Sequence, residues 1–230
     1  MGPSGSYGTL GARRRPPSPA SIMVLACALF LGAAAETPGR LLVPGSVVDE
    51  ADAAKPGDVW LCIGREGTLI RARRCPIAIE PGAEDGFGQP LDAAKMGAPL
   101  FLVTGVEGLR EGDVPTVTSE EVKLSQVGAS VTLGAERAVL AVSGREGGYE
   151  IAFSVGGKRQ VLARTTMLDD VNMGRPALLW AGDLDHDGKV DLLMDVSGHY
   201  SSMELRLFLS SRAGPDEVLR EVALRSHPGC

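Results

Sequence analysis

The sequence predicts a mostly β protein, in which antiparallel strands form a sandwich or a partial propeller-like sheet and helices are few and short. Three observations lead to this prediction. The chain contains 30 glycines and 15 prolines spread along its length, which divide it into many short elements. Several runs alternate apolar and polar residues, the period of a strand with one buried face. With 44% hydrophobic and 23% charged residues, the composition is not that of a disordered chain.

The first 35 residues have the regions of a secretory signal peptide. Arg13, Arg14 and Arg15 form a basic region, and residues 22–35 form an apolar, uncharged run. Three alanines at 33–35 provide the small residues that signal peptidase requires before Glu36. We therefore expect residues 1–35 to be removed on export, which would place the protein outside the cell or in a periplasm.

Two alternatives for this segment stay open. The apolar run could remain as an uncleaved anchor, although it is short for a membrane span. Residues 24–27 (Val-Leu-Ala-Cys) resemble a bacterial lipobox, in which Cys27 would carry lipid and anchor the protein to the envelope.

The charge balance is acidic. Removal of residues 1–35 takes away three arginines and no acidic residue, which changes the net charge from −6 to −9. Such a surface repels nucleic acid and attracts cations, so no nucleic-acid partner is expected. A cation is therefore the kind of small ligand that such a surface favours, and a protein or glycan at the cell surface is the macromolecular partner that we expect. The sequence does not indicate an oligomeric state.

Three cysteines follow the signal segment: Cys62, Cys75 and Cys230. Export makes a disulfide plausible, and we expect one between Cys62 and Cys75. The alternative is a bridge from Cys230 to one of the other two, which would fix the C-terminus.

The expected Cys62–Cys75 bridge requires a particular path of the chain between the two cysteines. A hairpin with its turn at residues 64–67 would place Cys62 near Leu69 rather than near Cys75. The bridge therefore requires the chain to turn back after Arg74.

Strand and turn patterns divide the chain after residue 35 into an N-terminal β region, residues 36–125, and a β meander, residues 126–230. In the first region, short helical stretches are expected at 47–55 and 91–96, and strands at 59–63, 68–73, 77–79, 100–103 and 114–117. The second region contains two successive groups of four strands, at 131–133, 138–142, 149–155 and 159–165 and then at 177–180, 190–196, 204–209 and 218–224. Gly156 and Gly157 predict a tight hairpin turn.

The most specific segment is Asp-Leu-Asp-His-Asp-Gly-Lys-Val-Asp-Leu at residues 183–192. It places aspartates at positions 1, 3, 5 and 9 and a glycine at position 6 of a loop. Calcium takes six to eight oxygen ligands, and Gly188 permits the sharp backbone turn that wraps an ion. The alternative is an acidic surface turn that binds nothing, since aspartate and glycine are common in turns.

This loop differs from an EF-hand. Position 12, where an EF-hand has a bidentate acid, is Met194, and the residues on both sides of the loop have strand patterns. The sequence therefore predicts a strand, a calcium loop and a second strand.

With Gly182 in front of it, the segment resembles the FG-GAP/VCBS repeat family, in which Gly-Asp-x-Asp-x-Asp-Gly-x-x-Asp-Leu joins two strands of a propeller blade. The integrin α-subunit propeller has the same type of calcium loop. The resemblance covers about residues 176–211 and one copy of the motif. The calcium ligands that it implies are the carboxylates of Asp183, Asp185, Asp187 and Asp191 and the backbone carbonyl of Lys189.

Motifs for catalysis are absent from the sequence, which has three histidines and neither His-Glu-x-x-His nor Gly-x-Ser-x-Gly. We therefore expect an exported calcium-binding module without catalytic activity. The alternative is a secreted hydrolase or hydrolase accessory that uses an acidic pair elsewhere in the chain.

Overall fold

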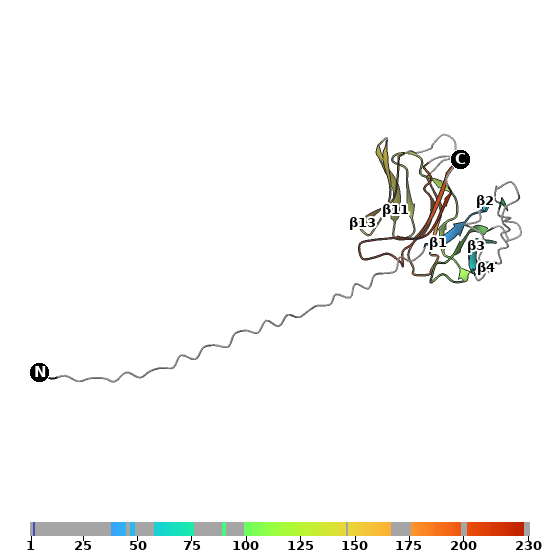
Figure 1. Ribbon diagram of the computed structural model, residues 1–230, viewed down its shortest axis with the longest axis horizontal. Coiled ribbons are helices and arrows are strands. Elements are labelled where there is room, and N and C mark those ends of the chain that lie inside the picture. The colour runs from blue at the N-terminus through green and yellow to red at the C-terminus, as the bar shows by residue number, and fades with distance from the viewer. Residues whose placement is uncertain are drawn as a thin grey trace. The chain divides into compact units, whose positions relative to one another are not determined.

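The computed structural model describes residues 2, 38–44, 47–48, 58–75, 89–90, 99–145, 147–166, 176–198 and 202–227. The chain from Thr37 to Cys230 forms one compact unit. Every regular element in the described residues is a strand, which confirms the mostly β prediction (Figure 1). No helix in this part of the chain is long and apolar enough to cross a membrane.

Several predictions fall outside the described residues. These are the signal segment with Cys27, the strand at 77–79, the helical stretches at 49–55 and 91–96, and Cys230. Val47–Val48 is described and forms strand β2, so the helix predicted from residue 47 is wrong at its start. β2 pairs with β5 (Gln89–Pro90). This pairing with a distant segment explains why residues 47–48 form a strand, because a long-range partner outweighs local helical preference.

The larger sheet has 11 strands. Its main path runs in the order β7-β4-β3-β6-β1-β17-β16-β15-β14-β8, with β9 also paired to β14. All neighbours are antiparallel except β1 and β17, which are parallel. The strands are β1 (Gly39–Leu42), β3 (Trp60–Glu66), β4 (Leu69–Cys75), β6 (Pro99–Thr104), β7 (Gly112–Asp113), β8 (Thr116–Thr118), β9 (Val122–Lys123), β14 (Ala177–Gly182), β15 (Asp191–Asp195), β16 (Met203–Leu209) and β17 (Arg220–His227).

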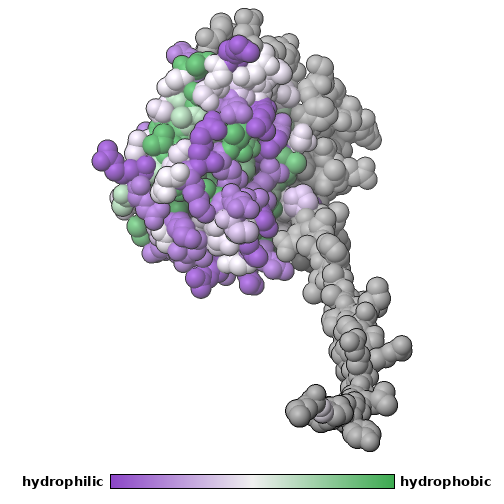
Figure 2. All heavy atoms as spheres, turned by 90° about the vertical axis from the view of Figure 1, so that its left-hand side faces the viewer, coloured by the Kyte–Doolittle hydropathy of each residue, from purple (hydrophilic) through white to green (hydrophobic). Residues whose placement is uncertain are grey.

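The smaller sheet is a four-stranded meander in chain order, made of β10 (Ser130–Leu133), β11 (Ala138–Arg145), β12 (Gly148–Val155) and β13 (Lys158–Thr165). Gly156 and Gly157, both with positive φ, form the turn between its last two strands as the sequence predicts. Figure 2 shows the left-hand face of Figure 1, where hydrophilic residues separate several smaller hydrophobic patches.

The larger sheet is strongly curled, and its two edges are consecutive in the chain. β7 lies at one edge and β8 at the other, and only Val114 and Pro115 separate them. The Val114 amide donates to the Ile70 carbonyl at 2.8 Å, and the Asp183 amide donates to the Pro115 carbonyl at 2.7 Å. This short segment therefore contacts the strand next to each edge of the curled sheet, at Ile70 in β4 and at Asp183 after the end of β14. The strand predicted at 114–117 begins only at Thr116, as β8.

Strands β14, β15 and β16 are buried on both faces. Leu193 of β15 and Leu207 of β16 belong to the core inside the curled sheet. Leu192 and Met194 of β15 and Phe208 of β16 belong to a second core against the smaller sheet. The smaller sheet thus packs as in a sandwich against one face of these strands, and the rest of the curled sheet covers their other face. β11 and β13 lie on the opposite side of them from β3 and β4 (Figure 1).

The two predicted groups of four strands are present as β10–β13 and β14–β17. β1 was not predicted, because a four-residue strand with glycine at its start carries little local signal. Its position depends on long-range pairing with β6 and β17. The larger sheet thus joins strands from both sides of residue 125.

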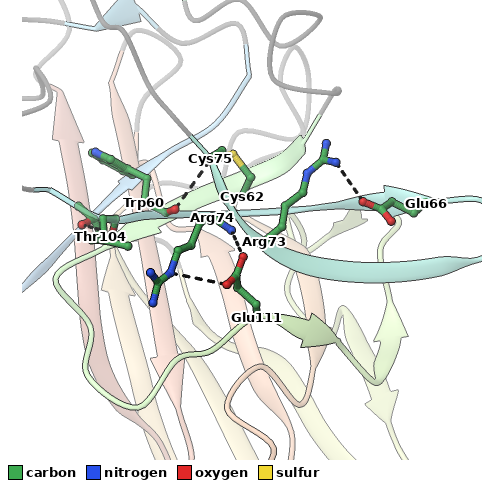
Figure 3. Close-up of a disulfide and its surroundings, with 9 residues drawn as sticks. Trp60, Cys62, Glu66, Arg73, Arg74, Cys75, Thr104 and Glu111 are labelled. Carbon is green, nitrogen blue, oxygen red and sulfur yellow. Dashed lines mark hydrogen bonds and ion pairs between the residues drawn. A yellow bond between two sulfur atoms is a disulfide. The ribbon is translucent and has the colours of Figure 1, made fainter.

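The structure contains the expected disulfide between Cys62 and Cys75, whose Cα atoms lie 5.8 Å apart (Figure 3). The path predicted for it is wrong. The hairpin turn lies at Gly67 and Thr68, where Gly67 has φ of +62°, so Cys75 pairs directly with Trp60. Cys62 and Cys75 are therefore diagonal neighbours on adjacent strands, and no turn after Arg74 is needed.

Candidate functional site: an acidic loop between two buried strands

The predicted strand–loop–strand unit is present: residues 183–190 connect β14 to β15. Gly182 ends β14 at a tight contact, because a Cβ atom there would lie 2.5 Å from the Pro115 carbonyl oxygen and 2.5 Å from the Trp180 ring. The side chain of Leu184 is buried in the core of the curled sheet. The loop therefore starts from a fixed position and is anchored by an apolar residue.

Three of the predicted ligands lie together. One carboxylate oxygen from each of Asp183, Asp185 and Asp187 lies within 4.8 Å of the other two. Negative charges at this separation repel one another, and a bound cation would remove the repulsion. All three groups offer the oxygen atoms that hard cations prefer, so the cluster could hold a metal ion.

Backbone geometry directs these carboxylates toward one another. The Asp183 carboxylate accepts hydrogen bonds from the amides of Asp187 at 2.9 Å and Gly188 at 3.0 Å. Asp185 accepts a second bond from the Asp187 amide at 3.2 Å. Gly188 has φ of +85° and His186 has φ of +64°, so the chain turns through the left-handed region twice. Gly188 thus permits the sharp backbone turn that the sequence predicts at this position.

Lys189 lies at the edge of the cluster. Its amide donates to the Asp187 carboxylate at 2.8 Å, and its ammonium lies 3.8 Å from the same carboxylate. One exposed ammonium beside three carboxylates leaves the loop with an excess of negative charge. The Lys189 carbonyl stays a ligand implied by the resemblance.

Asp191 has a different position from the other aspartates. It is completely buried, and its carboxylate accepts hydrogen bonds from the amides of Leu184 and Ser210, both at 2.8 Å. Asp191 is not part of the group formed by the other three carboxylates in the described residues. Its carboxylate instead joins the acidic loop to the end of β16.

Burial raises the pKa of Asp191 to about 7, because the ionised carboxylate loses its hydration. The negative charge of Asp185 raises the pKa further. Hydrogen bonds from Ser210 and Leu184 act in the opposite direction without offsetting the loss of water.

Sequence reasoning missed two residues at the site, Ser210 and Ser211, which follow the last residue of β16. The Ser210 hydroxyl donates to Asp187 at 2.9 Å and also lies 3.2 Å from Asp191. The Ser211 hydroxyl donates to Asp185. Two hydroxyls directly after an alternating strand are a weak sequence signal, and only the pairing of β16 with β15 brings them to the loop.

A scan against protein-family models found no match, and neither a search of curated proteins nor one of solved structures returned a similar protein. The function must therefore be inferred from the site itself.

The buried carboxylate predicts an unusual pH dependence in the presence of a chelator. Asp191 keeps its proton in the folded state up to pH about 7, whereas an unfolded chain releases it near the usual value of 3.8. The folded state therefore binds more protons between these values, and the free energy of unfolding should fall as pH rises through this window. The total change expected from this residue is on the order of a few kcal/mol.

Urea unfolding at a series of pH values between about 5 and 8, with chelator present, measures this effect. Asp191→Asn removes the titration and should flatten the pH dependence relative to the unmodified protein. An equal slope in the two proteins would contradict the assignment.

Proposed function

We propose that the protein is an exported calcium-binding module without catalytic activity, in which calcium fixes the loop between β14 and β15. The observation that carries the proposal is the cluster of Asp183, Asp185 and Asp187, whose ligand atoms lie within 4.8 Å of one another. The loop would belong to the FG-GAP/VCBS type, although the rest of the chain forms a curled sheet and a meander.

Calcium suits this donor set better than other common cations. The cluster offers oxygen atoms, whereas zinc prefers sulfur and nitrogen ligands. Magnesium requires near-ideal octahedral geometry, whereas calcium accepts the irregular arrangement of a short loop. In this proposal the carboxylate of Asp191 and the carbonyl of Lys189 complete the ligands. A nearby divalent cation would also lower the pKa of Asp191 and keep it ionised.

The proposed role of the ion is structural. Strands β14 and β15 belong to both cores, and the loop between them holds three repelling carboxylates. Calcium would neutralise this charge and stabilise the folded state by mass action wherever its concentration exceeds the dissociation constant.

The hydrolase alternative gains no support from the site. The acidic group found in the described residues belongs to the loop, and its oxygens engage amides and serine hydroxyls. We therefore put forward a binding module, with a protein or glycan at the cell surface as its partner.

Export is part of the same proposal. The Cys62–Cys75 disulfide supports an oxidising compartment, and the basic, apolar and small-residue regions of residues 1–35 support a cleaved signal peptide. The protein would then be secreted or periplasmic, with lipidation at Cys27 as the envelope-anchored alternative.

Calcium should raise the melting temperature of the protein. At a calcium concentration about 100 times the dissociation constant, the expected increase over chelator is about 5–10 °C. Asp185→Asn keeps the shape of the side chain but removes a charge from the cluster, so this variant should lose most of the increase.

Asp216→Asn is the matched control, because Asp216 is an exposed aspartate outside the loop. Differential scanning calorimetry gives the melting temperatures of the unmodified protein and of the two variants in calcium, in magnesium and in chelator. Equal melting temperatures with calcium and with chelator in the unmodified protein would reject the calcium proposal.

The export proposal predicts a mature protein that begins at Glu36. Intact-mass spectrometry of the protein recovered from a secreting host should give the mass of residues 36–230. A mass that includes the first 35 residues, or a lipid on Cys27, would contradict cleavage at this position.

A further inference from the structure

A cavity of about 710 Å³ opens at one end of the larger sheet. β3 begins there, β4 and β6 end there, and residues 105–111 form one wall. This volume lies within the range of small-molecule sites, which commonly occur at the mouths of curled or closed sheets. It is separate from the acidic loop.

Six of the twelve residues that line the cavity are polar or charged, and part of the apolar remainder continues into the core. Leu61 and Val103 line it and belong to the core inside the curled sheet. Val106 and Leu109 also line the cavity and pack against the same core. Val59, at the opening, is 54% exposed. An aliphatic chain placed here would contact these aliphatic side chains.

Most charged groups at the rim are paired within the protein. Asp58 forms an ion pair with Arg40. The Arg74 amide donates to Glu111 at 2.8 Å, and the Arg74 guanidinium lies 3.6 Å from the same carboxylate (Figure 3). These groups add little net charge to the opening.

Arg110 is the exception at the rim. Glu107 forms an ion pair with Arg212 at 3.6 Å, whereas Arg110 is exposed and has no ion pair within the described part of the chain. The rim charges and their ion-pair partners therefore sum to one positive charge, in a protein whose net charge is −6.

We propose that this cavity binds a linear aliphatic chain that ends in a single carboxylate, such as a fatty acid. The aliphatic chain lies on Leu61, Val103, Val106 and Leu109, and the carboxylate pairs with the guanidinium of Arg110. Arginine suits this role because its planar guanidinium binds a carboxylate through two parallel hydrogen bonds. The proposal does not depend on calcium binding by the acidic loop.

Dodecanoate tests the proposal, with isothermal titration calorimetry on the full chain below the critical micelle concentration. We expect saturable binding with one site per chain. Arg110→Glu should weaken this binding about ten-fold or more, because it replaces a charge-assisted pair by repulsion. Val59→Trp should abolish it, because the larger side chain fills the opening from an exposed position.

Matched controls separate these effects from general changes. Arg145→Glu makes the same charge change at an exposed arginine of β11, and Val127→Trp places the same ring at a valine that is 56% exposed. Both should bind dodecanoate like the unmodified protein. Dodecyltrimethylammonium, which has a similar chain and the opposite charge, should not compete.

Three results would overturn the proposal. The first is no saturable binding of dodecanoate to the unmodified protein. The second is equal affinity in Arg110→Glu and Arg145→Glu, which would exclude the rim charge. The third is unchanged binding in Val59→Trp, which would place the ligand elsewhere.

Discussion

The buried carboxylate of Asp191 is the contact on which the acidic loop and the strand ends around it depend. It accepts a hydrogen bond from the amide of Leu184 on one oxygen and from the amide of Ser210 on the other, and these two bonds join the loop to the end of β16. Without this contact, two backbone amides would lose their partners inside the protein. The other three aspartates are therefore held close together on a loop whose base is hydrogen-bonded to the end of β16.

The position of Asp191 follows from the burial of β14–β16 on two faces. One face fills the interior of the curled sheet, and the other packs against the four-stranded meander. A register shift between Leu178 and Trp180 lets β14 place Leu178 and Ala181 in the core against the smaller sheet and Trp180 in the core inside the curled sheet. The charged loop is thus attached to two strands that are buried on both faces. The three carboxylates that repel one another therefore lie next to strands that both cores share.

Much of this arrangement could be predicted from the sequence because it is local. The alternation around Leu205 and Leu207 and the Gly156–Gly157 turn depend on neighbouring residues, and so does the spacing of the aspartates. The curl of the sheet, the contact of Ser210 with the loop and the burial of Asp191 depend on pairings across long stretches of chain. The spacing of the aspartates predicts Asp191 as a calcium ligand like the other three. It gives no sign that this carboxylate accepts hydrogen bonds from two backbone amides. The hairpin turn at Gly67 was predicted too early for a simpler reason, since Gly64 offers an equally good local signal.

The most direct test of the account is a crystal structure of the protein grown with calcium, with anomalous diffraction measured at long wavelength. If the loop binds calcium, one calcium peak lies among the carboxylates of Asp183, Asp185 and Asp187, with oxygen atoms at about 2.3–2.6 Å from the ion. A cluster without a peak at millimolar calcium would contradict it. In that case the hydroxyls of Ser210 and Ser211 would still donate hydrogen bonds to the carboxylates of Asp187 and Asp185.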